Sequence, residues 1–308
     1  MKPVSVVIPV YGRDDALETV PFLMRQPYAD ALRIVVVDNG NAAERSARLK
    51  ELASAIVEVV SFPENRGGSA AYIAGMETAR RRFSECRCVW LLDDDAKPNG
   101  DTLPALVEAM DRLVSGNPRT ASVGSAVVSA SDPERIVECG ASFCPLLGHA
   151  FSKLAGRRLA DVGSRILRVD YAAACSLLVN VAAVEACGFW EDVFIHFDDI
   201  EWGVRATKAG WSNYATTAST VIHPEFDQGK AGAWICYFDA RNMYWLAAKY
   251  GGAAAVACVR AKNALKSLND RRSGRLARAA ARSLAWRDFR AGSRRTRKEV
   301  EEALERHG

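Results

Sequence analysis

The stretch VSVVIPV (residues 4–10) is followed by a helical pattern over 14–24 and then by a second apolar stretch, LRIVVVD (32–38). Both stretches are nearly continuous in Val, Ile and Leu, which is typical of strands buried on both faces of a sheet. A strand, a helix and a second strand in this order form a βαβ unit, whose strands pair in parallel. This part of the chain therefore predicts an α/β fold.

The alternation of strands and helices continues along the chain. Further strands are predicted over 56–62, 87–93, 122–128 and 135–143, and further helices over 42–53, 68–83, 101–114 and 200–209. The pattern is regular up to about residue 121 and less regular beyond it, and the segment 172–187 mixes strand and helix signals. We expect a mainly parallel central sheet flanked by helices.

The overall composition narrows the class of protein. Of 308 residues, 49% are hydrophobic and 25% charged, which is ordinary for a globular protein and excludes disordered and fibrous structure. No apolar run approaches the ~20 residues that cross a bilayer. Because a strand begins near residue 4, we expect no signal peptide. The eight cysteines have neither metal-site nor redox spacing, so reduced thiols in the cytoplasm are expected.

Charge is distributed unevenly along the chain. The formal net charge is +4, yet residues 260–298 alone contain 14 basic and two acidic residues, so the preceding part is acidic. Helical patterns over 234–250 and 253–268 lead into this basic stretch, in which Leu276, Ala280, Leu284 and Phe289 are interleaved with arginines. We expect an α/β domain over 1–225 and a helical region over 226–308 that ends in a basic amphipathic tail.

Three interpretations of the basic stretch are open. It could dock on an anionic membrane surface, bind nucleic acid, or form a solvated helical face or a subunit contact. The chain has no nucleic-acid fold motif and no aromatic–basic platform, so we expect no nucleic-acid partner. Peripheral attachment to the inner face of the cell membrane is favoured, and an oligomer is left open.

Candidate ligand-binding residues follow the predicted strands, because open α/β sheets bind ligands outside the carboxyl ends of their strands. These ends read Pro9-Val10-Tyr11-Gly12, Asp38-Asn39-Gly40, Glu64-Asn65-Arg66-Gly67-Gly68 and Asp93-Asp94-Asp95. The first turn has no G-x-G-x-x-G, and the chain has no G-K-[ST]. A dinucleotide-binding Rossmann site and a Walker ATPase are therefore disfavoured.

The three aspartates that follow the apolar run VWLL (89–92) indicate a metal site. Adjacent carboxylates repel one another, and each is costly to desolvate without a partner. A hard divalent cation such as Mg²⁺ or Mn²⁺ removes that cost by taking oxygen ligands. In extended backbone Asp93 and Asp95 point the same way and Asp94 the other. The alternative is a solvated acidic loop or a helix N-terminal cluster.

A second acidic group lies in FIHFDDIEW (194–202). Carboxylates favour helix N-termini, so helix capping is one interpretation. The aromatic surroundings support another, because an apolar setting raises the pKa of a carboxyl toward that of a general base.

These motifs together resemble the inverting family-2 glycosyltransferases with the GT-A fold. The resemblance rests on VVIPVY (6–11), VVDN (36–39), NRGG (65–68), LLDDD (91–95), and FDDIEW (197–202) followed by AGW (209–211). With Tyr-x-x-x-Arg-Asn at 237–242, the set is most similar to bacterial galactofuranosyl- and rhamnosyltransferases. It covers roughly residues 3–225 and implies a nucleotide-sugar donor, Mn²⁺ or Mg²⁺, and inversion at the anomeric carbon. The long flanking domains of the polymerising galactofuranosyltransferases are missing here.

For the donor, the resemblance implies that Asp38 accepts the imide N–H of uracil or thymine. Pro9 and Tyr11 would line the base and ribose pocket, and Asp94 would contact the ribose or the sugar.

For the diphosphate, the resemblance implies that Arg66 and the amides of Gly67 and Gly68 face it at a helix N-terminus. Asp93 and Asp95 would hold the metal that the diphosphate also binds.

For catalysis, the resemblance implies that Asp199 deprotonates the acceptor hydroxyl and that Asp198 orients it. His223 would complete the metal site, the alternative being a core or surface histidine. Trp190 and Trp202 are either core residues or platforms for a sugar.

The expected function is thus metal-dependent inverting transfer of a sugar from a UDP- or dTDP-sugar to a hydroxyl of a glycan or lipid-linked acceptor, in cell-wall or polysaccharide biosynthesis. Galactofuranose and rhamnose are the favoured sugars. One alternative, a nucleotidyltransferase that makes nucleotide sugars, predicts a Gly-rich basic loop after the first strand, which YGRDD (11–15) matches poorly. The other, a non-catalytic sugar-binding relative, would not need a candidate base besides the metal carboxylates.

Overall fold

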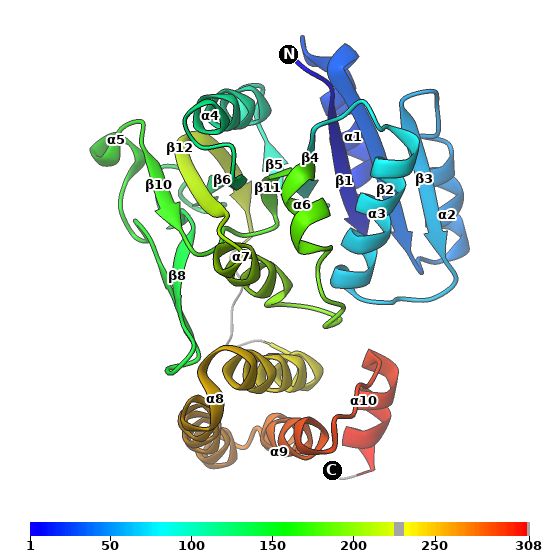
Figure 1. Ribbon diagram of the computed structural model, residues 1–308. Coiled ribbons are helices and arrows are strands. Elements are labelled where there is room, and N and C mark those ends of the chain that lie inside the picture. The colour runs from blue at the N-terminus through cyan, green and yellow to red at the C-terminus, as the bar shows by residue number, and fades with distance from the viewer. Residues whose placement is uncertain (225–230, 307–308) are drawn as a thin grey trace. The chain divides into compact units, whose positions relative to one another are not determined.

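The computed structural model describes residues 1–224 and 231–306, which fold into two compact units (Figure 1). We call them the sheet unit and the helical unit. The sheet unit consists of Met1–Ser142, Ser152–Asp192 and Asp198–Glu225, and the helical unit of Phe143–Phe151, Val193–Phe197 and Phe226–Gly308. Two segments from before residue 225 thus belong to the helical unit.

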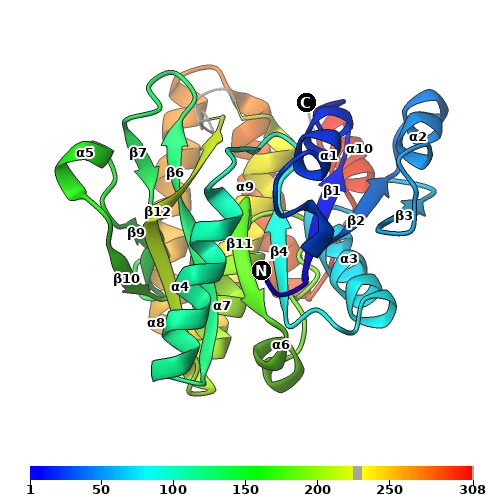
Figure 2. The ribbon, with the colours of Figure 1, turned by 90° about the horizontal axis from the view of Figure 1, so that it is seen from above.

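The central sheet has the strand order β10-β12-β6-β11-β4-β1-β2-β3 (Figure 2). Its strands are β1 (Val4–Val10), β2 (Leu32–Asn39), β3 (Val57–Phe62), β4 (Cys88–Leu92), β6 (Thr120–Ser129), β10 (Ile166–Val169), β11 (Ser176–Asn180) and β12 (Ser212–His223). At its margins, β5 (Lys97–Pro98) pairs with β12 and β7 (Ile136–Glu138) pairs with β6. A separate pair consists of β8 (Ala141–Cys144) and β9 (His149–Ser152).

Most strands of the sheet point in one direction. β1 is parallel to β2 and β4, and β2 is parallel to β3. β11 is antiparallel to both β4 and β6, and β6 is parallel to β12, so β6 and β12 run with β4. Among the eight strands of the order given above, only β11 and β10 run antiparallel to the others. The sheet is mixed, and the predicted α/β architecture is confirmed.

Helices cover both faces of the sheet because alternate strand residues supply two separate cores (Figure 1). In β2, for example, Val35 and Val37 face one core while Ile34 and Val36 face the other, and all four are fully buried. The first core packs on α3 (Gly68–Arg82), α6 (Val181–Cys187) and α7 (Asp198–Lys208), and the second on α1 (Ala16–Met24), α2 (Ala43–Lys50) and α4 (Thr102–Gly116). The short α5 (Leu159–Val162) and the 3-10 turn η1 (Ala29–Ala31) complete the unit.

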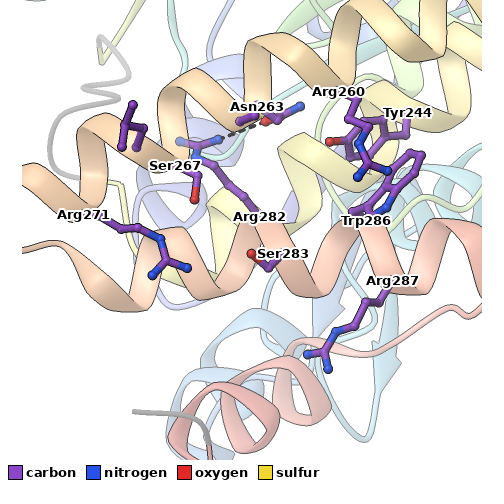
Figure 3. A pocket seen from close by; sticks show the side chains of 11 residues that line it. Tyr244, Arg260, Asn263, Ser267, Arg271, Arg282, Ser283, Trp286 and Arg287 are labelled. Carbon is purple, nitrogen blue, oxygen red and sulfur yellow. Dashed lines mark hydrogen bonds between the residues drawn. The ribbon is translucent and has the colours of Figure 1, made fainter.

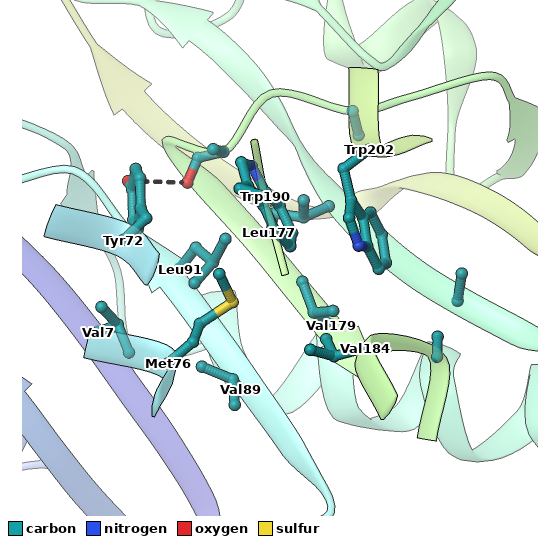
Figure 4. Close-up of a cluster of buried hydrophobic side chains, with 14 of the residues drawn as sticks. Val7, Tyr72, Met76, Val89, Leu91, Leu177, Val179, Val184, Trp190 and Trp202 are labelled. Carbon is teal, nitrogen blue, oxygen red and sulfur yellow. Dashed lines mark hydrogen bonds between the residues drawn. The ribbon is translucent and has the colours of Figure 1, made fainter. Parts of the chain in front are cut away.

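Two tryptophans occupy the first core. Trp190 and Trp202 stack with ring centroids 4.6 Å apart, and both are almost completely buried beside Leu177 and Val179 (Figure 4). The indole N–H of Trp202 donates to the carbonyl of Gly188. Both residues are therefore core residues, and the alternative of sugar platforms is wrong.

The helical unit is built from α8 (Ala233–Arg272), α9 (Leu276–Ala291) and α10 (Arg297–Glu305). Gly252 interrupts α8 with a positive φ of 69°, which separates the two helices that the sequence predicts. Thr296 and Glu299 form a reciprocal capping box that begins α10.

The apolar residues of the basic tail form part of a core. Leu284 is buried, and Phe289 packs against Tyr244 and Trp286. Leu276, in contrast, is 63% exposed. Leu284 and Phe289 therefore join α9 to α8.

The segment 193–197 has unusual backbone geometry. Phe194, His196 and Phe197 all have positive φ, which costs energy in residues with side chains. The side-chain amide of Asn242 donates to the carbonyls of Val193, Ile195 and His196 and so holds this conformation. The Arg-Asn pair singled out in the sequence thus fixes the segment that leads into Asp198.

None of the helices in residues 1–224 and 231–306 combines the length and the apolar character needed to cross a bilayer. All eight cysteines are free thiols.

Candidate active site

The predicted site residues gather at one edge of the sheet unit. β1, β2, β4 and β12 run in the same direction, so their carboxyl ends share this edge. Asp93, Asp94 and Asp95 directly follow β4, and His223 is the last residue of β12. The topology therefore brings together acids and an imidazole that are far apart in the sequence.

Asp93, Asp95 and His223 form a group that fits a divalent cation. One potential ligand atom from each lies within 4.8 Å of the others. Nε2 of His223 is 3.2 Å from Oδ1 of Asp95 and 3.5 Å from Oδ2 of Asp93. Two carboxylates and one imidazole are a donor set that Mn²⁺ accepts readily and that Mg²⁺ accepts through the oxygens.

The other nitrogen of His223 supports this role. Nδ1 lies 2.8 Å from the carbonyl oxygen of Pro224, which only accepts hydrogen bonds, so Nδ1 carries a proton. In the neutral ring the lone pair is then on Nε2, which faces the two carboxylates. A backbone carbonyl that orients a metal-binding histidine in this way is common in metal sites.

Tyr72 is a partner of Asp93 that the sequence analysis did not identify. Its buried hydroxyl donates to Oδ1 of Asp93 at 2.5 Å. Burial acts to raise the pKa of Asp93, but neighbouring His223 and the hydrogen bond from Tyr72 hold it below its ordinary value. Asp93 is therefore an anion at neutral pH, as a metal ligand must be.

The loop after β1 reaches the same cluster. Arg13 forms an ion pair with Asp95, and the amide of Tyr11 donates to Oδ2 of Asp94 at 3.3 Å. Burial and the charge of Asp93 raise the pKa of Asp94 to about 6. Arg13 was missed because a single arginine in a loop carries no motif, although its place directly after the first strand is a signal.

Asp38 is placed at the end of β2 but is only 1% exposed. Its Oδ1 accepts from the side-chain amide of Asn41 at 2.8 Å, and Asn41 also joins the end of β1 by donating to the carbonyl of Val10. Burial acts to raise the pKa of Asp38, but hydrogen bonds from Ser46 and Asn41 keep it lowered. Pro9 is half-buried nearby in β1. Recognition of a pyrimidine base by Asp38, Pro9 and the exposed Tyr11 stays a prediction.

The NRGG loop is organised by two asparagines. Oδ1 of Asn39 accepts from the amide of Arg66 at 2.9 Å, and Oδ1 of Asn65 accepts from the amide of Gly67 at 2.8 Å. The amide of Gly67 is thus hydrogen-bonded inside the loop, and its role toward a diphosphate stays a prediction. Arg66, whose exposed side chain lies over the ring of Phe62, and Gly68, the first residue of α3, stay candidates.

Gly40 allows this loop to pack closely. Its φ is +74°, and an added Cβ would lie 2.2 Å from the backbone of Glu64. No residue other than glycine fits there without moving the backbone.

Asp199 lies in the first turn of α7, next to Asp198. Its carboxylate accepts from the amides of Ile200 at 2.7 Å and Ala174 at 3.3 Å. Burial first, and then the charges of Asp198 and Glu138, raise the pKa of Asp199 to about 8. A carboxyl with a pKa near neutrality suits a general base.

Asp198 and Glu201 differ from Asp199 in their surroundings. Asp198 is 8% exposed at the start of α7, where it raises the pKa of its neighbour. Glu201 is completely buried and forms a salt bridge with Arg205 at 2.9 Å. Because Glu201 is engaged in this salt bridge with Arg205, Glu201 is disfavoured as a proton acceptor.

Ala174 connects the metal-binding group with Asp199. Its amide donates to Oδ2 of Asp199, and its carbonyl oxygen lies 3.2 Å from the hydroxyl of Tyr72 that donates to Asp93. The amide of Asp93 in turn donates to the carbonyl of Cys175 at 3.2 Å. The candidate metal ligand and the candidate base are thus held by the same short backbone segment.

Glu138 on β7 is a further acid that sequence reasoning missed. Its Oε1 is buried and has no hydrogen-bond partner among the described residues. Burial raises the pKa of Glu138 to about 7, and its charge contributes to the raised pKa of Asp199. An isolated acid in a short strand carries no motif, so only the fold reveals it.

Comparison with known proteins shows which protein family and which fold the chain resembles. Residues 5–134 match the model of the family described as "Glycosyl transferase family 2". The structure resembles that of GalNAc-T7 with UDP, GalNAc and Mn²⁺, with a TM-score of 0.55 and 13% identity over 79% of this chain and 51% of that one. The sheet unit therefore has the GT-A fold, and the predicted resemblance to the family-2 glycosyltransferases is confirmed.

More specific similarity is found to two curated relatives. The chain is 24% identical over 272 residues to galactofuranosyltransferase GlfT2 of Mycolicibacterium smegmatis, and 24% identical over 270 residues to GlfT2 of Mycobacterium tuberculosis. Each alignment covers 80% of this chain and 41% of the relative. The chain thus spans less than half the length of these relatives.

These comparisons agree with the predicted class of enzyme, a glycosyltransferase, and with the expectation of a divalent metal. The solved relative holds Mn²⁺ together with UDP, and this chain places two carboxylates and an imidazole within reach of one cation.

Proposed function

We propose that the chain is a metal-dependent inverting glycosyltransferase that moves galactofuranose or rhamnose from a UDP- or dTDP-sugar to a hydroxyl of a glycan or lipid-linked acceptor, in cell-wall or polysaccharide biosynthesis. One observation carries the proposal: the cation-binding group and the carboxyl of raised pKa are joined through Ala174. The names of the two curated relatives favour galactofuranose.

The chemistry follows from this arrangement. Asp93, Asp95 and His223 would hold a divalent cation, whose positive charge would offset the negative charge of the diphosphate leaving group. Asp199 takes the proton of the acceptor hydroxyl. The acceptor oxygen bonds to the anomeric carbon on one face while the bond to the diphosphate oxygen breaks on the other, so the configuration inverts. The bonding electron pair leaves with the nucleoside diphosphate, and Asp198 orients Asp199.

A donor panel tests this proposal. UDP-galactofuranose and dTDP-rhamnose should raise the Tm and be hydrolysed slowly in the presence of Mn²⁺ or Mg²⁺, whereas the corresponding sugar phosphates should do neither. Release of diphosphate from a nucleoside triphosphate and a sugar phosphate would instead identify a nucleotidyltransferase. Binding without turnover on any acceptor would identify a non-catalytic relative.

Glu138→Gln should shift the rising limb of the pH–activity profile to lower pH. Removing a neighbouring negative charge makes ionisation of Asp199 easier, so the base is active at lower pH, with an expected shift of the order of half a unit to one unit. Kinetics between pH 5 and 9 measure it. Glu134→Gln, which changes an exposed acid in the turn before β7, should leave the profile in place. An unmoved limb in the Glu138 variant would refute the electrostatic coupling.

We further propose that the helical unit docks on the anionic inner face of the cell membrane. Its arginines and lysines lie on the same helices as three exposed leucines, Leu265, Leu268 and Leu276, which are 69%, 45% and 63% exposed. Each basic residue near an anionic surface is worth ~1 kcal/mol.

Vesicle sedimentation tests the docking. The full chain should sediment with phosphatidylglycerol vesicles at low salt and be released at 1 M salt, where the screening length falls to ~3 Å. Phosphatidylcholine vesicles are the matched neutral control. If the protein stays in the supernatant with anionic vesicles at low salt, the basic surface serves a subunit contact or is simply solvated.

A further inference from the structure

A pocket opens between the C-terminal half of α8 and the facing side of α9. Its volume is about 440 Å³, within the usual range for sites that bind small molecules (Figure 3). All residues that line it belong to the helical unit. It is therefore separate from the acidic site of the sheet unit.

The pocket is strongly cationic. Four arginines line it: Arg260, Arg271, Arg282 and Arg287. Arg282 is neutralised by Asp270 at 3.1 Å, but Arg260, Arg271 and Arg287 form no salt bridge within the described part of the chain. Unlike the acidic cluster at the sheet edge, this pocket has an excess of three positive charges.

Asp270 does not offset this excess. Its Oδ1 accepts from Arg275 at 2.9 Å and its Oδ2 from Arg282 at 3.1 Å, so both oxygens are already engaged. No acid is among the residues that line the pocket. An anion from outside the chain is the partner that would balance the remaining charge.

The buried part of the pocket lining is polar. Tyr244, Asn263 and Arg282 are buried, and the guanidinium of Arg282 donates to Oδ1 of Asn263 at 3.3 Å (Figure 3). The guanidinium of Arg260 lies 4.2 Å above the ring of Trp286, which orients it without using its N–H donors. Pre-oriented guanidinium groups match the oxygens of a phosphate better than an ammonium does.

An apolar border adjoins the arginines. Leu268 lines the pocket, and Leu265 lies three residues earlier on the same helix, so the two share a face. Both side chains are exposed. A cationic pocket beside exposed leucines is complementary to a molecule with an anionic head and an apolar chain.

We propose that this pocket binds the phosphate group of an anionic lipid, with the start of its acyl chain against Leu268 and Leu265. The proposal rests on the membrane docking above, which it localises to one site. General attraction to a charged surface would use all the exposed arginines about equally, whereas a lipid-phosphate site depends on those that line the pocket.

The test is a titration of the full chain with dihexanoyl phosphatidic acid below its micelle concentration, followed by tryptophan fluorescence. Trp286→Phe identifies the part of the signal that comes from the pocket. In Arg271→Gln/Arg287→Gln the Kd should rise about tenfold or more. Arg272→Gln/Arg290→Gln removes the same charge from exposed arginines of the same helices that do not line the pocket, and should change the Kd less than about twofold.

Two further probes separate the sources of phosphate. Dihexanoyl phosphatidylcholine and inorganic phosphate should both bind far more weakly than the phosphatidic acid. Equal losses in the two double variants would overturn the pocket in favour of general electrostatics, and inorganic phosphate binding as tightly as the lipid would overturn the lipid assignment. Equal thermal unfolding of both variants confirms that they are folded. Because the titration needs no sugar donor, its outcome is independent of the glycosyltransferase proposal.

Discussion

Replacing Asp199 with asparagine should lower the turnover number by about 10²–10⁴-fold, the usual effect of losing a general base. Asparagine keeps the size of the side chain, and its carbonyl oxygen can still accept a hydrogen bond from Ile200 or Ala174, but it cannot take a proton from the acceptor. Binding of donor and Mn²⁺, measured by thermal shift, should stay near that of the unchanged protein.

The stability of this variant offers a second measurement. The pKa of Asp199 in the folded chain lies above its ordinary value, so the protonated form is favoured by folding. The stability that the protonated carboxyl contributes is therefore lost as pH rises toward and through about 8. Asparagine cannot ionise, so the Tm of Asp199→Asn relative to the unchanged protein should increase between pH 5 and pH 9.

Two comparisons decide the assignment. Glu185→Gln, an exposed acid on α6, should leave turnover unchanged. Near-normal turnover in Asp199→Asn combined with a large loss in Asp198→Asn would move the base to Asp198. A loss confined to donor affinity would give Asp199 a binding role instead.

The parallel half of the sheet was predictable because its strands are buried on both faces and read as unbroken apolar runs. β1 and β4 end directly before Tyr11 and Asp93. Both residues could therefore be placed at the candidate site from their position in the sequence alone. The secondary structure of the segment 172–187 could not be predicted from the sequence. The chain passes directly from β11 into α6 there, and no Gly or Pro separates the strand pattern from the helix pattern.

Residues that act through tertiary contact were not predictable. Tyr72 reaches Asp93 from the middle of a helical pattern, and Glu138 influences Asp199 from a three-residue strand. His223 was assigned only through the resemblance, because its meeting with Asp93 and Asp95 depends on the pairing of β12 with β6.

The basic tail shows a further limit of prediction from a sequence pattern. Apolar residues at helical spacing among arginines predict an amphipathic helix but do not reveal what its apolar face contacts. Leu284 packs inside the helical unit, whereas Leu276, in the same helix, is exposed. The pattern therefore predicted the helix but not which of its apolar residues are buried.

Removal of the divalent cation should also lower the enzymatic activity strongly. A chelator should abolish donor hydrolysis, and Mn²⁺ or Mg²⁺ added in excess should restore it. Asp93→Asn and Asp95→Asn should each lower kcat/KM by at least about 10²-fold, because a metal supplies several kcal/mol of charge stabilisation to the transition state and each 1.4 kcal/mol is tenfold. The exposed acid Asp101 at the start of α4 is the control, and Asp101→Asn should behave normally.

The variant Tyr72→Phe distinguishes residues that bind the metal from a residue that only orients a metal ligand. The phenol does not belong to the cation-binding group but donates to Asp93 at 2.5 Å, so its loss should weaken Mn²⁺ affinity by about 10–100-fold, as for other groups that orient a metal ligand. Saturating Mn²⁺ should then restore most of the turnover of Tyr72→Phe but little of that of Asp95→Asn. Full activity of Asp93→Asn and Asp95→Asn in chelator would contradict a metal-dependent reaction, and the acids would then act only through their contacts with Tyr72, Arg13 and His223.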